Sequence, residues 1–353
     1  MSGKQVVTYL LLAVCLPTSC YRPIAKSKER AVNIIFDTDI GPDVDDVGAV
    51  AVLHALADKG EATILGMLCN TTSEWGAPCL NALNTYYGRA DIPIGTLKST
   101  GTSGDSPDWN GFAYNRFIAE EFPNNLKSGL NAPDAIDVYR RILAKQQDNT
   151  VVIISVGALT NLRNLLLSKA DQFSQLSGAE LVQKKVKILS LMAGGYPKGK
   201  ENDPNFMMDI DASIYVVNNW PGFIMFSGVE IGQPVKTGAK LIETPPGNPV
   251  REAYIQWDSH FWKKWDSNYV ERSIHPHDSY DQTSVLFAIR GLHDYWLAEY
   301  DGKNTVFENG SNEWKKVVGG RHHYLVQKRS PESIAQVIDS LMNKPRKYKR
   351  HIY

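Results

Sequence analysis

The 353-residue chain carries no net charge and has little cysteine. Its 38 lysine and arginine residues balance 38 aspartate and glutamate residues, so the formal net charge is zero. A neutral chain gives no electrostatic reason to expect nucleic acid or an anionic membrane surface as a partner. Internal repeats, low-complexity stretches and linkers are also missing from residues 32–350, which we therefore expect to form one domain.

Long apolar runs are also lacking, apart from one near the N-terminus. The run Val6–Leu16 follows Lys4 and is too short to span a bilayer, so it predicts a signal peptide over residues 1–20. Cys20 stands where a bacterial lipoprotein is cleaved and lipidated, although Pro17 is unusual three residues before such a cysteine. Ordinary signal cleavage and an uncleaved anchor remain alternatives.

Lipidation at Cys20 would place the protein in the cell envelope, in the periplasm or at the outer membrane, with a soluble periplasmic form as the alternative. Residues 21–31 are polar and basic, and would then act as a tether. The only membrane contact expected is this lipid anchor. Outside the leader only Cys69 and Cys79 remain. An exported protein could pair them, but the sequence does not show whether their geometry fits.

Apolar, strand-like runs alternate with helix-compatible segments along the rest of the chain. Such alternation predicts right-handed crossovers and an α/β fold, a Rossmann-like open and mostly parallel sheet flanked by helices. The expected strands are Asn33–Phe36, Thr63–Cys69, Ile92–Gly95, Thr150–Val156, Val186–Met192 and Phe223–Phe226, and the expected helices are 46–58, 74–87, 133–145, 159–167 and one starting at Ser330-Pro331.

Polar clusters follow the strands that end at Phe36, Val156, Met192 and Phe226. In a parallel sheet these clusters meet at the C-terminal ends of the strands, where open α/β sheets bind their ligands. We therefore expect the active site at that edge. Residues 98–115 are rich in Gly, Ser, Thr, Asp and Trp without a period, and predict a surface loop near the site.

The most acidic of these clusters follows the first strand. Two bare charges about 4 Å apart repel by roughly 4 kcal/mol at an effective dielectric of 20. A helix N-terminus returns only about 0.3–1 kcal/mol for each carboxylate, so the crowding favours a hard-metal site over a solvated turn that caps a helix. The carboxylates are those of Asp37, Asp39, Asp43, Asp45 and Asp46.

Two familiar acidic motifs do not fit this turn. An EF-hand loop starting at Asp37 requires Gly at its sixth position and Glu at its twelfth, where this chain has Pro42 and Gly48. A haloacid-dehalogenase-type phosphatase expects Thr or Val two residues after the second Asp, where this chain has Gly41.

The turn resembles the signature of the calcium-dependent nucleoside hydrolases of the inosine–uridine-preferring type, a strand followed by D-x-D-x-G-x-D-D. This chain is two residues longer there, which is similar to exported bacterial relatives of that family. Four further blocks resemble the family in the same order over nearly the whole mature chain: Val156–Asn161, Met192–Tyr196, Asp203–Asp209 and Ser279–Val285. The resemblance implies an N-glycosyl hydrolase that converts a ribonucleoside and water to ribose and base.

The resemblance also implies a calcium site. Asp39 matches a ligand that also acts as the general base on the attacking water, and Asp46 and Asp281 match two further carboxylate ligands. Val156 stands where a backbone carbonyl binds the ion. Calcium takes 6–8 oxygen ligands, so this set leaves positions for a water and for the ribose diol.

The expected substrate contacts follow from the same resemblance. Asp45 matches a residue that holds the ribose 2′-hydroxyl, and Asp203 and Asn205 match residues that hold the sugar hydroxyls. Phe261 and Trp265 fall on a helix that offers aromatic side chains to the base. The partner implied is a small nucleoside or riboside rather than nucleic acid. Members of the family are commonly dimers or tetramers, so the resemblance also implies a homo-oligomer.

Two positions depart from the family pattern. Tyr280 replaces the His that precedes the distal Asp as acid for the leaving group, and His277 lies close upstream as an alternative acid. Thr72 stands where the family often has a sugar-binding Asn, with Asn70 two residues earlier. These departures leave two alternatives open, a riboside-binding lipoprotein without turnover and a hydrolase of another glycoside.

Overall fold

The computed structural model describes residues 31–98 and 114–345. The predicted signal peptide, Cys20, residues 21–30 of the predicted tether and nearly all of the predicted loop over 98–115 lie outside the described residues. None of the described helices combines the length and hydrophobicity needed to cross a membrane.

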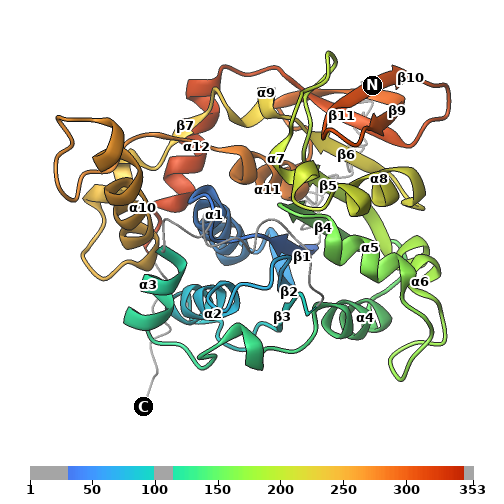
Figure 1. Ribbon diagram of the computed structural model, residues 1–353, viewed down its shortest axis with the longest axis horizontal. Coiled ribbons are helices and arrows are strands. Elements are labelled where there is room, and N and C mark those ends of the chain that lie inside the picture. Colours follow the sequence, from blue (N-terminus) through green and yellow to red (C-terminus); the bar gives the residue numbers. More distant parts are fainter. Residues whose placement is uncertain (1–30, 99–113, 346–353) are drawn as a thin grey trace, which may run out of the picture. The chain divides into compact units, whose positions relative to one another are not determined.

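A nine-stranded sheet forms the centre of the described chain, in the order β10-β9-β11-β6-β5-β4-β1-β2-β3 (Figure 1). The strands from β11 to β3 in this order all pair in parallel, and β9 and β10 add an antiparallel edge. The strands are β1 Val32–Thr38, β2 Ala62–Cys69, β3 Ile94–Thr96, β4 Val151–Val156, β5 Val186–Met192, β6 Ile224–Ser227, β9 Trp296–Val306, β10 Asn312–Lys316 and β11 His322–Gln327.

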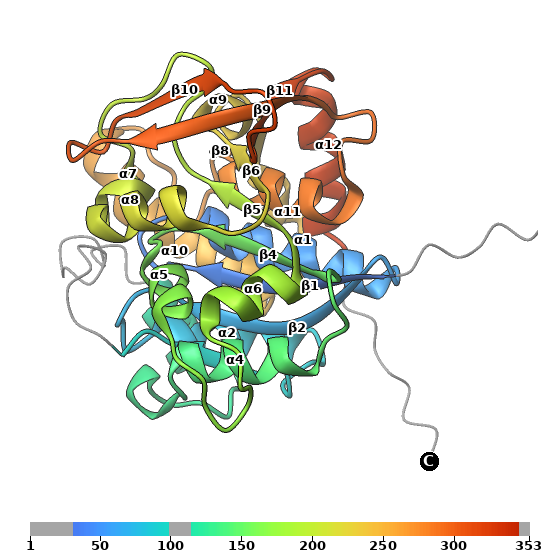
Figure 2. The ribbon, with the colours of Figure 1, turned by 90° about the vertical axis from the view of Figure 1, so that its right-hand side faces the viewer.

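Helices cover both faces of this sheet and enclose two apolar cores. Figure 2 looks onto the face covered by one set of helices, α4 Ala135–Lys145, α5 Thr160–Leu167, α6 Gly178–Lys185 and α8 Ile210–Asn219. The opposite face packs against α1 Asp45–Asp58, α2 Gly76–Tyr86, α3 Tyr114–Glu121, α10 Pro249–Trp265, α11 Tyr280–Arg290 and α12 Pro331–Met342.

The central strand β4 shows why these residues form a sheet buried on both faces. Every residue of Val151–Val156 is buried. Side chains alternate between the two faces, so Val152 and Ile154 enter one core while Val151 and Ile153 enter the other. The β-branched run Val151–Ile154 is therefore stable here because water reaches neither face.

The predicted fold class is confirmed, and each predicted strand and helix overlaps an element of the structure. The antiparallel strands β9 and β10 are additions that the sequence analysis did not anticipate. Cys69 and Cys79 are both buried and free rather than joined in a disulfide. A short ribbon of β7 Lys236–Thr237 and β8 His277–Asp278 leads into the N-terminus of α11.

Candidate active site

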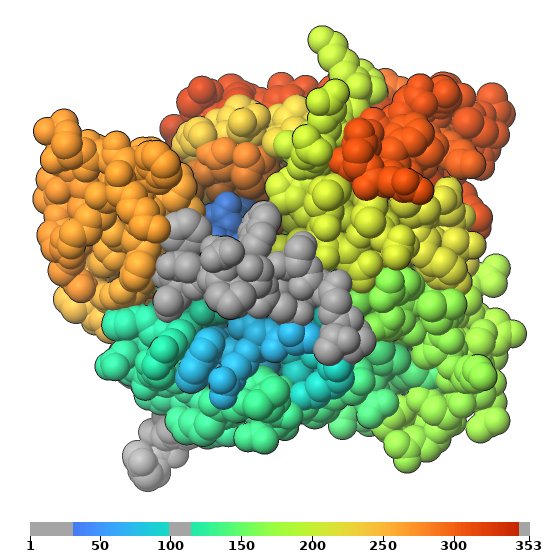
Figure 3. Space-filling model, viewed as in Figure 1, coloured from blue at the N-terminus to red at the C-terminus, as the bar shows by residue number. Residues whose placement is uncertain are grey.

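A cavity of about 400 Å³ opens at the C-terminal ends of the parallel strands. In Figure 3 the blue atoms of the β1–α1 region lie recessed between the orange segment around α10 and the yellow-green segment that follows β5. The described lining of this cavity includes six carboxylates, those of Asp39, Asp43, Asp45, Asp46, Asp203 and Asp281. A second cavity, of about 630 Å³, contains a single carboxylate, Glu243, and therefore has no comparable cluster.

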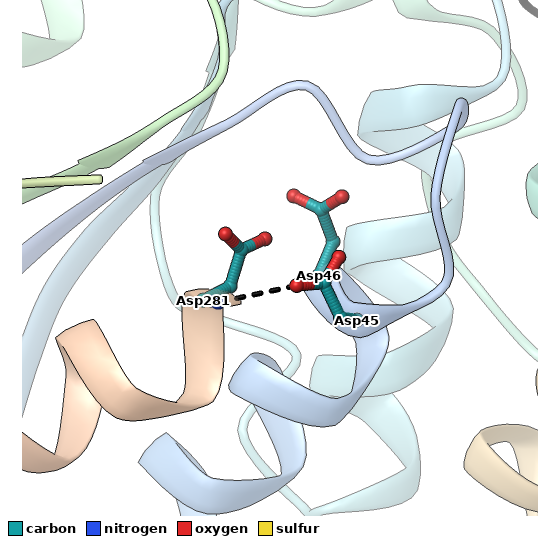
Figure 4. Close-up of side chains that lie close together, drawn as sticks. All are labelled: Asp45, Asp46 and Asp281. Carbon is teal, nitrogen blue, oxygen red and sulfur yellow. Dashed lines mark hydrogen bonds between the residues drawn. The ribbon is translucent and has the colours of Figure 1, made fainter. Parts of the chain in front are cut away.

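Two helix N-termini bring three of these carboxylates together. Asp45 and Asp46 occupy the first turn of α1, and Asp281 occupies the first turn of α11. Each offers an oxygen within 4.8 Å of the others, and Figure 4 shows the three side chains facing a common space. The backbone N–H of Asp281 donates to Asp45 Oδ2 at 3.1 Å, which ties the two helix ends together.

Asp39 joins this cluster from the end of β1. Its carboxyl lies beside that of Asp46, and the Thr38 hydroxyl donates to Asp46 Oδ1. Gly157, in the left-handed region with φ 99°, lies directly behind Asp39, because a Cβ added there would stand 2.6 Å from Asp39 Cγ. The turn after β4 therefore sets the position of the Asp39 carboxyl.

The electrostatics of the cluster fit a hard cation. Burial raises the pKa of Asp39 to about 7, and burial followed by repulsion from neighbouring carboxylates raises the pKa values of Asp45, Asp46 and Asp281 well above the ordinary range. Among the described residues, no lysine or arginine pairs with any of the four. A divalent cation would offset both effects, and oxygen donors are the ligands that calcium and magnesium prefer.

The Val156 carbonyl lies among the groups that support the turn. It accepts a hydrogen bond of 3.0 Å from Asn70 Nδ2, while Asn70 Oδ1 is buried without a hydrogen-bond partner among the described residues. A carbonyl oxygen has a second lone pair, so this contact still leaves Val156 able to bind a cation. Asn70, at the end of β2, thus supports the Val156 carbonyl, and neither Asn70 nor Thr72 lines the cavity.

Asp37 has a separate, supporting position. Its Oδ2 accepts from the Tyr139 hydroxyl at 2.6 Å and its Oδ1 from Asn161 Nδ2 at 3.2 Å. Asn161 also donates to the Cys69 carbonyl at 3.0 Å. Asp37 is fully buried and does not line the cavity, so it joins β1 and β2 to the helices α4 and α5 instead.

Asp203 and Asn205 also line the cavity. Asp203 caps the short helix α7 Pro204–Met207 by accepting from Phe206 N at 3.2 Å. Asn205 Nδ2 donates to the Met192 carbonyl at 2.8 Å. The Oδ1 atom of the same amide therefore points away from that carbonyl. Both were predicted to hold the sugar, and the structure places both at the cavity with the predicted residues Asp39, Asp45, Asp46, Asp281 and Tyr280.

Five predicted residues do not line the cavity: Thr72, Val156, Phe261, Trp265 and His277. The Trp265 side chain is 76% exposed. Phe261 stacks on Trp257 with ring centroids 4.6 Å apart, and it is Trp257 that borders the cavity. His277 is buried behind the same indole, with its Nε2 2.5 Å from Asp258 Oδ1.

Three polar or aromatic residues at the cavity had no assigned role. Trp257 lies one helical turn before Phe261, so its spacing on the same helix face was the available signal. Asp43 lines the cavity while its Oδ1 accepts from Val44 N at 2.7 Å. Lys200 comes from the loop after β5, where nothing in the sequence pattern marked it.

Comparison with known proteins adds an independent observation. A family model described as inosine-uridine preferring nucleoside hydrolase matches residues 34–318. No protein in the curated set matches the chain.

Solved structures share the fold at low sequence identity. A purine-preferring ribonucleoside hydrolase from Gardnerella vaginalis superposes with a TM-score of 0.66 at 14% identity, covering 88% of this chain and 98% of that chain. A plant nucleoside hydrolase gives 0.64 at 16%, covering 89% and 99%. The type III effector protein XopQ, complexed with adenosine diphosphate ribose, gives 0.65 at 13%, covering 90% and 94%.

Proposed function

Since this chain belongs to the inosine-uridine preferring nucleoside hydrolase family, we propose that it hydrolyses the N-glycosidic bond of ribonucleosides with the help of bound calcium. The observation that carries the proposal is the convergence of Asp45, Asp46 and Asp281 within 4.8 Å of one another. They lie in a cavity of about 400 Å³, which is within the usual size of small-molecule sites.

Asp39, Asp46, Asp281 and the Val156 carbonyl would hold the ion, and Asp45 lies close enough to contribute. The residues present are all hard oxygen donors, and the flexible, high coordination number of calcium suits a mixed carboxylate and carbonyl set. When bound, such an ion supplies a water of lowered pKa and an anchor for a vicinal diol.

The protein's own groups then divide the remaining work. Asp39 takes the proton of the attacking water. Its carboxyl lies beside Asp46, which would hold the ion that supplies this water, and general-base catalysis requires hydrogen-bond reach. Asp45, Asp203 and Asn205 hold the sugar hydroxyls and orient the anomeric carbon. The carboxylate lining also provides a negative potential for the oxocarbenium-like sugar that forms as the bond breaks.

The leaving base would lie on the Trp257 side of the cavity. Tyr280 lines that cavity and donates to Asp278 Oδ2 at 2.8 Å. His277 is held by Asp258 behind Trp257. Tyr280 is therefore the better placed of the two candidate acids to contact the base.

The test is release of reducing sugar from a panel of ribonucleosides, with calcium and with a chelator. We expect turnover in calcium, loss of turnover in chelator, and a fall of about 10²- to 10⁴-fold in kcat for Asp39→Asn. Asp134→Asn is the matched control, because Asp134 caps α4 through Ile136 N and an asparagine keeps that cap. An Asp39→Asn enzyme as fast as wild type would refute the mechanism.

A binding protein without turnover is the second candidate, and the Tyr at position 280 favours it because the usual leaving-group acid is replaced. Calorimetry with the same nucleosides separates the two. Tight, calcium-dependent binding with no base released over hours would support the binding protein. Turnover of other glycosides, but not of nucleosides, would instead support a hydrolase of a different substrate class.

A further inference from the structure

Lys200 is the only basic residue among the described residues that line the acidic cavity. It belongs to the loop between β5 and α7, which also carries Asp203, and Asn205 follows within α7. The Lys200 ammonium group would repel a cationic transition state, so its presence in a carboxylate-lined cavity needs an explanation.

The backbone of Lys200 is fixed by the antiparallel edge of the sheet. Lys200 N donates to Asn312 Oδ1 at 3.0 Å, and Asn312 N donates to the Lys200 carbonyl at 3.2 Å. Asn312 is the first residue of β10 and is only 5% exposed. Gly199 precedes Lys200 with φ 83°, and an added Cβ there would stand 2.1 Å from the Asn312 carbonyl. The loop is therefore built around this contact.

The ammonium group has no such partner. Within the part of the chain that the structure describes, no hydrogen bond or ion pair engages Lys200 Nζ. Other lysines, such as Lys185 and Lys236, pair with carboxylates. The positive charge nevertheless acts on Asp203, where it opposes the rise in pKa that burial imposes. Lys200 thus places its charge on the Asp203 side of the cavity.

We propose that Lys200 binds a phosphate ester on the 5′ carbon of the substrate's ribose, so that the protein prefers nucleoside 5′-monophosphates to free nucleosides. The inference rests on the proposed function. If the acidic cluster engages the 2′- and 3′-hydroxyls, and water must reach the anomeric carbon, C5′ is the remaining sugar position that can carry a charged group. A phosphate among the carboxylates would be repelled unless a cation paired with it, and lysine binds phosphate as a point charge.

The first test compares kcat/KM for inosine and inosine 5′-monophosphate. Wild type should favour the monophosphate by about tenfold or more, the effect of one charge-assisted hydrogen bond. Lys200→Gln should abolish this preference and Lys200→Glu should reverse it. Lys198→Gln is the matched control, because Lys198 is exposed on the same loop and does not line the cavity, so this variant should keep the preference.

The inference is overturned if wild type shows no preference, or if Lys200→Gln keeps it. Either result, combined with rapid cleavage of free nucleosides, would leave the proposed function intact and assign Lys200 only to offsetting the acidic charge.

A second measurement does not depend on turnover. Calorimetry in calcium compares ribose 5-phosphate, ribose and inorganic phosphate as probes. Ribose 5-phosphate should bind about tenfold more tightly than ribose in wild type, and this advantage should vanish in Lys200→Gln. Inorganic phosphate binding as tightly as ribose 5-phosphate would overturn a sugar-linked site. If no nucleoside or nucleotide is cleaved while the ribose 5-phosphate advantage persists, the proposed hydrolase function fails and the phosphate site stands.

Discussion

The indole of Trp257 borders the cavity and is held in place by three neighbouring residues. Its Nε1 donates to the Pro42 carbonyl at 3.3 Å, which links α10 to the acidic turn. Phe261 stacks against it at 4.6 Å, and His277 packs edge-on at the same distance. A ring fixed in this way loses little conformational entropy when a base stacks on it.

We expect Trp257→Ala to raise KM for nucleosides by about tenfold or more, because stacking of a base on an aromatic side chain contributes about 1–3 kcal/mol. Trp265→Ala is the matched control on the same helix, and its 76% exposed side chain should leave KM unchanged. Steady-state kinetics with both variants checks this. If Trp265→Ala raises KM and Trp257→Ala does not, the sequence-based assignment of Trp265 to the base was correct.

These two tryptophans show which part of the site could be predicted from sequence. The resemblance identified the aromatic helix and the acids Asp39, Asp45, Asp46 and Asp281, because each follows a recognisable motif. It did not identify which turn of the helix faces the cavity, since that depends on how α10 rotates against the acidic turn. The sequence could not predict that Lys200 lines the cavity for a similar reason, because its position depends on Asn312, more than one hundred residues later in the chain.

Among the elements, the junction of β4 with the turn that follows it shapes the acidic cluster. It supplies the Val156 carbonyl and then, at Gly157, leaves room for the Asp39 carboxyl. Only glycine combines a φ of 99° with the absence of a Cβ at this point.

We therefore expect Gly157→Ala to lower kcat by about 100-fold or more, because a displacement of about 1 Å in a catalytic group has an effect of that order. It should also weaken calcium binding. Gly60→Ala is the control, since Gly60 has φ 76° but nothing within 4 Å of an added Cβ. That variant should lose about 1–2 kcal/mol of stability from backbone strain alone and keep its activity.

Kinetics, calcium titration and thermal unfolding of both variants distinguish the two effects. Equal losses of activity in the two variants would mean that left-handed strain, and not contact with Asp39, matters. The parallel strands and their helices were predictable because buried β-branched runs and helix signals are local patterns. The edge strands β9 and β10 were not, since their many exposed residues do not show a clean alternation.

For the molecule as a whole, the acidic cluster is a junction between distant parts of the chain. The hydrogen bond from Asp281 N to Asp45 Oδ2 joins residues 236 positions apart. The buried carboxylates oppose this junction, because a carboxyl whose pKa is raised in the folded protein destabilises the fold at any pH above its ordinary value. A bound cation would reverse that contribution and stabilise the folded state by mass action.

This balance predicts that the wild type and Asp46→Asn exchange their order of stability when calcium is added. In chelator at pH 7, Asp46→Asn should be at least as stable as wild type, because an amide removes a buried charge and can still accept from the Thr38 hydroxyl. Calcium at about 100 times its Kd should then stabilise wild type by roughly 2.7 kcal/mol and the variant far less, because a ligand carboxylate is missing. Thermal unfolding with and without calcium measures both differences. The same measurement with magnesium tests the choice of ion, and magnesium should stabilise wild type less, since its smaller octahedral shell suits this mixed donor set less well. An equal calcium effect in both proteins, or none in wild type, would show that the cluster does not hold the ion.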